Sequence, residues 1–386
     1  MSSSAADDAL HRLTAPFTRR DDAGDIWSGA NIIAIDRDDL PVPSLVLFVL
    51  TRTMGLVDLG EHEKTRWHVP FGFRGHRVTL ALQKFGMRMY IDVTKGSREI
   101  AQAIADDVVR SLKKVIRIVE KTTLADIASQ QLADANVTIA NQSGRLRAMY
   151  KHFRQQASEA FAASQLAPET PEAKEGVGAF FAAVGDRIGQ EQSGAWETIA
   201  AVNAYFSLLE HEMVLLFAFA DLNPAYGALQ TFIGNRWGLK FKCLFDVSDR
   251  STKHVYEALH AIAETYRNPY NHGGFEKGNA ALWFHVPGIA AMPARLSDYR
   301  ESPHFEVFPV QPESFDKICA TLDDTEHWLR RGIHAHAFDW IDSGLDISFD
   351  AESRENYRDL AANPKRRQAE IDHRSHLAER AANMNF

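Results

Sequence analysis

The fold class is decided by residues 77–93, which read RVTLALQKFGMRMYIDV. Apolar side chains occupy every second position on both sides of Gly86: Val78, Leu80, Leu82, Met87, Met89 and Ile91. A period of two is the pattern of a strand with one buried face. Gly86 supplies the turn between the two runs. We therefore predict two antiparallel strands, buried on one face.

The chain before this hairpin adds further strands. Residues 67–73 lie just upstream, and two short apolar runs, IIAI at 32–35 and LVLFVL at 45–50, have strand-like composition. The second run follows Pro-Val-Pro, which disfavours a helix. We therefore predict an antiparallel meander of four or five strands. Residues 1 to about 28 are polar and are expected to form a mobile lead-in.

A long helix follows the sheet. Ser97 can cap it, and apolar residues then recur every three or four positions. This apolar stripe consists of Ile100, Ile104, Val108, Leu112, Val115 and Val119. The opposite face is basic and is ordinarily a solvated face, with a binding stripe as the alternative. Residues 166–176 are rich in Ala, Pro and Glu and predict a linker, which bounds an α+β domain at 29–165 of unknown role, a possible sensor or specificity domain.

The second half of the chain is helical. A long amphipathic helix is predicted from Trp196 to Phe217, and shorter helices follow at about 225–233, 237–245 and 255–266. Asp249 or Ser251 can cap the last of these, which is expected to end near Asn268 because Pro269 follows. We predict a small hairpin between 281 and 310 and a last long helix at 312–342. The overall class is α+β, with a helical bundle at 177–346 and a charged tail at 347–386. This tail has few apolar residues and is expected to be either a peripheral helix or disordered.

Composition limits the class of protein. The 386 residues are 45% hydrophobic and 24% charged, with a net charge of −8, which disfavours nonspecific coating of nucleic acid. No unbroken apolar run approaches the roughly 18 residues of a membrane span, and the amino terminus lacks the features of a secretory signal. We therefore expect a cytoplasmic protein that does not enter the membrane. Cys243 and Cys319 suit buried structural thiols.

Common catalytic signatures are missing from the sequence. Neither the dinucleotide-binding glycine fingerprint nor the Walker phosphate loop occurs, and there is no G-x-S-x-G or H-E-x-x-H motif. His334 and His336 lie two apart on a predicted helix, so they are not expected to share a metal. We therefore expect neither a metal nor a cofactor.

One segment concentrates polar groups. Residues 266–275 read YRNPYNHGGF and lie at the end of an amphipathic helix, where a rigid scaffold would hold them. An arginine and a histidine five positions apart recur elsewhere in the chain, so the spacing alone decides nothing. The surrounding region 235–277 holds seven cations and five anions, a small excess that could face a phosphate.

The set Arg267-Asn268-x-x-x-His272, placed between late helices of a bundle whose first long helix reads AYFSLLEHEMVLLF, resembles the HEPN superfamily. The resemblance covers about residues 195–342. It implies a bundle of four or five helices, frequent dimers and, in many members, metal-independent RNA cleavage in toxin, antitoxin-paired or antiviral defence roles. Other members are noncatalytic. Some members paired with an antitoxin carry a tyrosine two residues after the histidine, where this chain has Gly274.

The resemblance assigns catalysis to Arg267, His272 and Asn268. Histidine titrates near neutral pH and can act as base or acid, and arginine can hold two phosphate oxygens. The expected substrate is RNA. Further contacts to it are expected from Asn271, Tyr270, Lys240 and Lys253. A homodimer would supply a second histidine, and a protein antitoxin or regulator is a further expected partner. The alternative is a catalytically silent bundle used for interaction or for sensing nucleic acid.

Overall fold

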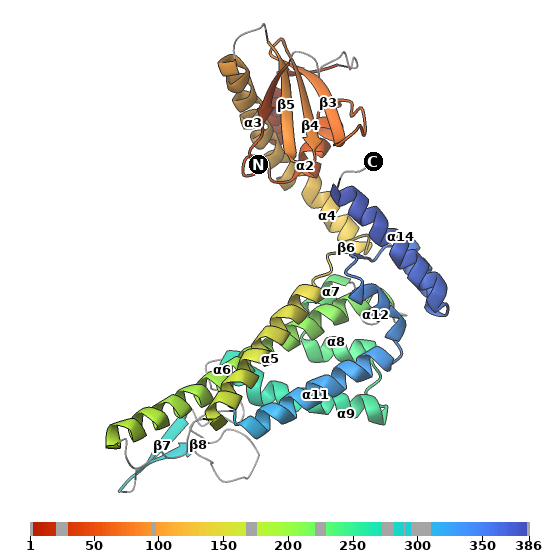
Figure 1. Ribbon diagram of the computed structural model, residues 1–386. Coiled ribbons are helices and arrows are strands. Elements are labelled where there is room, and N and C mark those ends of the chain that lie inside the picture. Colours follow the sequence, from red (N-terminus) through yellow and green to blue (C-terminus); the bar gives the residue numbers. More distant parts are fainter. Residues whose placement is uncertain are drawn as a thin grey trace. The chain divides into compact units, whose positions relative to one another are not determined.

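The computed structural model describes residues 3–20, 30–93, 98–166, 176–220, 229–271, 282–288, 290–294 and 310–383 (Figure 1). The chain divides into two compact units. The first contains residues 1–131 and 372–386, and the second contains residues 132–371. The first unit is built on an antiparallel sheet and the second is helical, so the predicted α+β class is confirmed.

The sheet of the first unit has five strands in the order β1-β3-β4-β5-β2. Their bounds are β1 Phe17–Arg19, β2 Asn31–Ala34, β3 Thr65–Phe73, β4 His76–Gln83 and β5 Gly86–Asp92. All pairings are antiparallel, and Gly86 has a φ of +116°, which suits the turn between β4 and β5. The predicted meander is therefore confirmed from residue 65 onward, and residues 31–34 close one edge. The prediction of one buried face was wrong, because Thr79, Ala81 and Tyr90, which lie between the predicted apolar positions, are buried too.

The apolar run at 45–50 is helical, so its assignment to a strand was wrong. It forms α2 (Pro43–Phe48) and continues into a short π-helix, η1 (Val49–Thr53). Pro43 occupies the first turn of α2, where the missing N–H and the fixed φ of proline suit a helix start. Val46, Val49 and Leu50 are buried in the core of this unit. A short, wholly apolar run carries no periodicity that separates a strand from a buried helix.

Helix α3 (Arg98–Lys121) covers the sheet with the predicted stripe, from which Ile100 departs because it is 53% exposed. The predicted cap Ser97 lies outside the described residues. The lead-in was predicted to be mobile, and instead residues 3–14 form α1 and residues 17–19 form β1. Phe17 packs on Phe71 and Phe73 of β3, which explains why this segment is ordered. Helix α4 (Thr123–Ala133) follows α3.

The helical unit is built on α5 (Ser143–Leu166) and α6 (Gly176–Leu216), which lie side by side (Figure 1). Gly194 of α6 allows the close approach, because a Cβ there would lie 2.8 Å from the Phe161 ring of α5. The domain boundary predicted at 166–176 therefore falls inside one unit. The linker joins two packed helices, and the units divide after residue 131 instead.

Helix α6 is followed along the chain by further elements of this unit. They are α7 (Leu229–Gly234), α8 (Trp237–Leu244), α9 (Arg250–Ile262), η3 (Ala263–Arg267), α10 (Asn268–Asn271), β7 (Leu282–Val286), β8 (Ala290–Ala294), α11 (Pro312–Arg331) and α12 (Ala335–Asp342). The strands β7 and β8 form the predicted hairpin. The last long helix is interrupted at Gly332, so it forms two helices rather than one.

The segment predicted to be a charged tail is part of the fold. Strand β9 (Ile347–Ser348) pairs with β6 (Thr138–Ile139), and α13 (Ala351–Ala361) and α14 (Pro364–Asn383) follow. Tyr357, Leu360 and Ile371 are buried in the main core. A few apolar residues at helical spacing are enough to dock an otherwise charged helix.

Helix α6 is the most apolar helix of the bundle. Residues 182–216 are long and apolar enough to cross a membrane, and 72% of the apolar window is buried inside the protein. Length and composition alone are weak evidence for a membrane span, and the burial of this stretch is that of the core helix of a soluble protein. Trp196 was predicted to face the core but is 62% exposed. Cys243 and Cys319 are free thiols, half-buried and buried respectively.

Candidate functional site

The backbone around Arg267 is helical beyond the predicted end of α9. Asp249 caps the first turn of α9 by accepting a hydrogen bond from the Thr252 N–H. At the other end, the Asn268 N–H donates to the Ala263 carbonyl, the wider spacing of a π-turn, and Pro269 sits in the first turn of α10. The widened turn accommodates the proline ring, which would clash with the carbonyl four residues earlier in a regular helix. The sequence predicted that the helix ends near Asn268, but helical turns continue through Asn271. The position of Arg267 is set by η3.

Arg267 is held against α6. Its Nη2 donates to Glu210 Oε1 at 2.9 Å, and its guanidinium carbon lies 5.0 Å from the centre of the Phe206 ring. Phe206 and Glu210 are four residues apart and so share one face of α6. The Arg267 side chain keeps 21% of its surface exposed. One edge of the guanidinium is therefore fixed by the bundle, and its Nε is buried without a hydrogen-bond partner among the described residues, while part of the side chain stays exposed.

Lys240 reaches the same carboxylate from α8. Its Nζ lies 3.1 Å from Glu210 Oε2, and the residue is only 5% exposed. The structure therefore brings Lys240 and Arg267 together, as two cations on one glutamate. Lys240 was predicted to be a substrate ligand, and it is placed instead as a buried partner of Glu210.

Sequence reasoning missed Glu210. Its partners lie 30 and 57 residues away along the chain, so no local pattern joins them. One signal was present: Glu210 and Glu212 interrupt an otherwise apolar helix, LLEHEMVLLF at 208–217. Acidic residues in a core helix are usually paired with cations, because an unpaired charge there is costly.

The other predicted site residues fall in different places. Asn268 is half-buried at the start of α10, and Tyr270 is 42% exposed. Burial, with a smaller effect of Tyr266, raises the pKa of Tyr270. Asn271 is the last residue of α10, and His272 lies outside the described residues.

Lys253 is not brought to Arg267. It lies near the start of α9, fourteen residues before the arginine, which corresponds to about 20 Å along a helix. Its side chain is 63% exposed and lies 3.7 Å from Glu257. The predicted role of Lys253 in the same substrate site therefore has no geometric support.

A second buried charge cluster surrounds Glu212, two residues from Glu210. The Glu212 side chain is 1% exposed and receives a hydrogen bond of 2.5 Å from Arg147 of α5. Arg147 and Arg330 both bind Glu326 of α11, at 2.7 and 2.6 Å. Arg330 also lies 3.1 Å from Asp342 of α12. The cluster ties four helices together.

Glu212 is in an unusual electrostatic position. Its burial, together with the charge of Glu326, raises its pKa to about 7. Its Oε2 atom is buried without a hydrogen-bond partner among the described residues. The hydroxyl of Tyr205 is also buried, and burial followed by the Glu326 and Glu212 charges raises the Tyr205 pKa. When Glu212 is protonated, the charges of the two arginines equal those of the two remaining carboxylates, Glu326 and Asp342.

Within the part of the chain that the structure describes, no three His, Cys, Asp or Glu side chains are grouped to hold a metal ion. No protein-family model, curated protein sequence or solved structure matches this chain.

Proposed function

We propose that the chain is an endoribonuclease of HEPN type that cleaves RNA without a metal ion, through attack by the 2′-hydroxyl. The observation that carries the proposal is the Arg267 guanidinium. Glu210 fixes it at one edge, Phe206 lies under it, and the arginine side chain, five residues before His272, keeps part of its surface exposed. A fixed, partly exposed planar fork is suited to a phosphodiester.

The chemistry needs three groups. A base removes the 2′-hydroxyl proton as the oxygen attacks phosphorus, an acid gives a proton to the departing 5′-oxygen, and a cation stabilises the charge on the phosphorane oxygens. His272 serves as base or acid, and Arg267 is the cation. Asn268, next to Arg267, orients the imidazole or contacts the nucleotide. The products are a 2′,3′-cyclic phosphate and a free 5′-hydroxyl.

Glu210 acts as a positioning residue in this scheme. It accepts one hydrogen bond from Arg267 and so sets the plane of the guanidinium before RNA arrives. Lys240 offsets part of the negative charge of Glu210. The carboxylate therefore orients Arg267 without cancelling its attraction for phosphate.

One histidine in each motif supplies half of the acid–base pair, so we propose a homodimer that brings two Arg267–His272 segments together. The resemblance that motivates the proposal also suggests a toxin or antiviral defence role in the cytoplasm, with a protein antitoxin or regulator as a further partner.

The competing function is an inactive HEPN-like module that binds a partner or senses nucleic acid. The Glu210–Arg267 ion pair favours this inactive module, because the Glu210 carboxylate at 2.9 Å already occupies one hydrogen-bonding edge of the guanidinium. In that case Arg267 ties η3 to α6 and has no role in chemistry.

The test is RNA cleavage by the purified full-length protein in excess EDTA, with His272→Ala and a control, His254→Ala. His254 is an exposed histidine on α9. The proposal expects cleavage in EDTA, loss in His272→Ala, and wild-type activity in His254→Ala, with 2′,3′-cyclic phosphate ends. Cleavage that requires magnesium or leaves 5′-phosphates would contradict the mechanism. Absence of cleavage on any RNA would favour the inactive module.

A further inference from the structure

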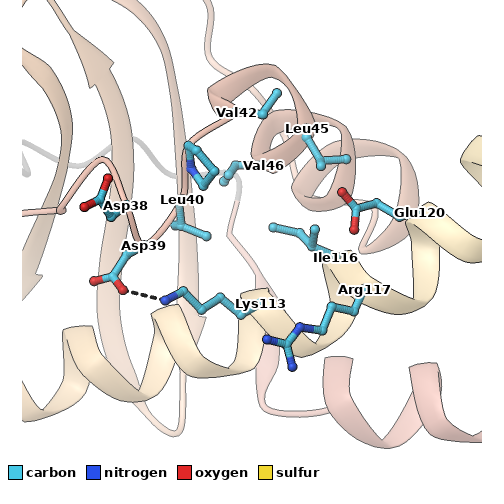
Figure 2. Close-up of a pocket in the computed structure, with 11 residues that line it drawn as sticks. Asp38, Asp39, Leu40, Val42, Leu45, Val46, Lys113, Ile116, Arg117 and Glu120 are labelled. Carbon is cyan, nitrogen blue, oxygen red and sulfur yellow. Dashed lines mark hydrogen bonds and ion pairs between the residues drawn. The ribbon is translucent and has the colours of Figure 1, made fainter. Parts of the chain in front are cut away.

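The first unit contains a pocket that the proposed ribonuclease activity does not use. It lies between residues 38–42, α2 and α3, and has a volume of about 290 Å³ (Figure 2). Pockets for small molecules begin at about 300 Å³, so this one suits a compact ligand rather than a stretch of polymer.

The floor of the pocket is apolar. It is formed by Leu40, Pro41, Val42, Leu45 and Val46 on one side and by Ile116 of α3 on the other. Val42 is 52% exposed, and Leu45 and Ile116 are half-buried. Covering these side chains would remove apolar surface from water, which favours a ligand with an apolar body.

An ion pair fixes the two sides of the pocket. Lys113 of α3 reaches Asp39 across 2.5 Å, and both side chains remain partly exposed (Figure 2). The pair joins the 38–42 segment to α3 and neutralises its own charges. It therefore positions the pocket walls and leaves recognition of a charged ligand to the neighbouring residues.

Three charged side chains that line the pocket, Asp38, Arg117 and Glu120, have no partner within the described ranges. Arg117 and Glu120 are exposed on α3, line the pocket beside Ile116, and make no ion pair or hydrogen bond with any other described residue (Figure 2). They are three residues apart, so they lie on one face of the helix about 5–6 Å apart at Cβ. One cation and one anion thus stand side by side over an apolar floor.

We propose that this pocket binds a small zwitterion with an apolar body, of the size and chemistry of a free α-amino acid with a large apolar side chain. Arg117 binds its carboxylate and Glu120 its ammonium group, while the side chain covers Leu45, Val46 and Ile116. A simple anion would meet the repulsion of Glu120, and a simple cation that of Arg117. A neutral apolar molecule would cover both charges without replacing their water.

The experiment is isothermal titration calorimetry on the full-length protein with L-leucine, L-phenylalanine and L-tryptophan. N-acetyl-L-leucine keeps only the carboxylate, and L-leucinamide keeps only the ammonium. The proposal expects saturable binding of at least one amino acid, with both single-charge analogues weaker by tenfold or more. Arg117→Gln and Glu120→Gln should each weaken binding by a similar factor.

The control is Lys114→Gln, an exposed residue of the same helix that does not line the pocket. It should bind as the wild type does. Circular dichroism confirms that the three variants keep the fold, since all three side chains are exposed. No saturable binding of any of the three amino acids would overturn the proposal, as would equal binding of N-acetyl-L-leucine or binding that both pocket substitutions leave unchanged. The assay measures no RNA cleavage, so its outcome is independent of the ribonuclease proposal.

Discussion

The two units place their charges differently. The first unit, residues 1–131 and 372–386, carries 20 cationic and 19 anionic side chains, whereas residues 132–371 carry 23 and 32. In the first unit the Lys113–Asp39 pair lies at the surface, and in the second Glu210 and Glu212 carry buried or half-buried pairs into the core. Exposed pairs leave charges free to meet a ligand, while buried pairs commit them to structure or to a fixed geometry. We therefore expect the stability of the helical unit to depend more on its ion pairs than that of the sheet unit does.

The largest expected effect comes from breaking the buried cluster. Arg147→Met removes the cation that binds Glu212 and Glu326 and leaves two buried carboxylates short of a partner. We expect a loss of about 3–5 kcal/mol in the unfolding free energy of the helical unit. Lys113→Met, the matched change in the sheet unit, should cost at most about 1 kcal/mol. Urea unfolding followed separately for the two units measures both, and similar losses would refute the contrast between them.

The next effect is a change of about 3 kcal/mol in the unfolding free energy with pH. Glu212 has an ordinary pKa of 4.5 in the unfolded chain and about 7 in the fold. Between these values the folded state binds more protons, so stability falls as pH rises from about 4.5 to 7 and then levels off. Glu212→Gln should flatten this part of the profile. If the unfolding midpoint of Glu212→Gln still falls by the wild-type amount between pH 5 and 7, a group other than Glu212 is responsible for the pH dependence.

The contact between α5 and α6 gives an effect of intermediate size. Gly194→Ala places a methyl group 2.8 Å from the Phe161 ring and should destabilise the helical unit by about 1–3 kcal/mol. Gly189→Ala, five residues earlier on α6, meets nothing within 4 Å and should stabilise by up to about 1 kcal/mol. Thermal unfolding of the two variants distinguishes a packing effect from helix propensity, and shifts of the same sign would contradict the close approach.

The smallest expected effect distinguishes an active site that two chains build together from one that each chain completes alone. When His272→Ala chains are mixed and re-equilibrated with wild-type chains, a two-histidine site makes every mixed dimer inactive. Ribonuclease activity should then fall as the square of the wild-type fraction, to a quarter in an equal mixture. A fall to one half would mean that each chain works alone.

The sheet was predictable because apolar side chains recur with a period of two in residues 78–91. The burial of its other face was not predictable, since the intervening residues Thr79, Ala81 and Tyr90 do not form an apolar pattern and are nevertheless buried. The helical assignment of residues 45–50 was not predictable either, because a wholly apolar run fits either a strand or a buried helix. The domain boundary failed for a related reason: a Pro- and Glu-rich linker has the same composition between domains and between two helices of one hairpin. The candidate site was proposed from a cluster of polar residue types near Arg267. Glu210 was not predictable, since its pairing with Lys240 and Arg267 exists only after α6, α8 and η3 pack together.

The most direct test of the ribonuclease account is the rate of RNA cleavage by Arg267→Lys beside the wild type. Lysine keeps the charge opposite Glu210 and so preserves most of the ion pair, but it cannot present two parallel N–H groups to phosphate. The account predicts a fold with near wild-type stability and a cleavage rate at least tenfold lower. Full cleavage activity in the lysine variant would contradict it, because the planar guanidinium held by Glu210 would then have no part in the reaction.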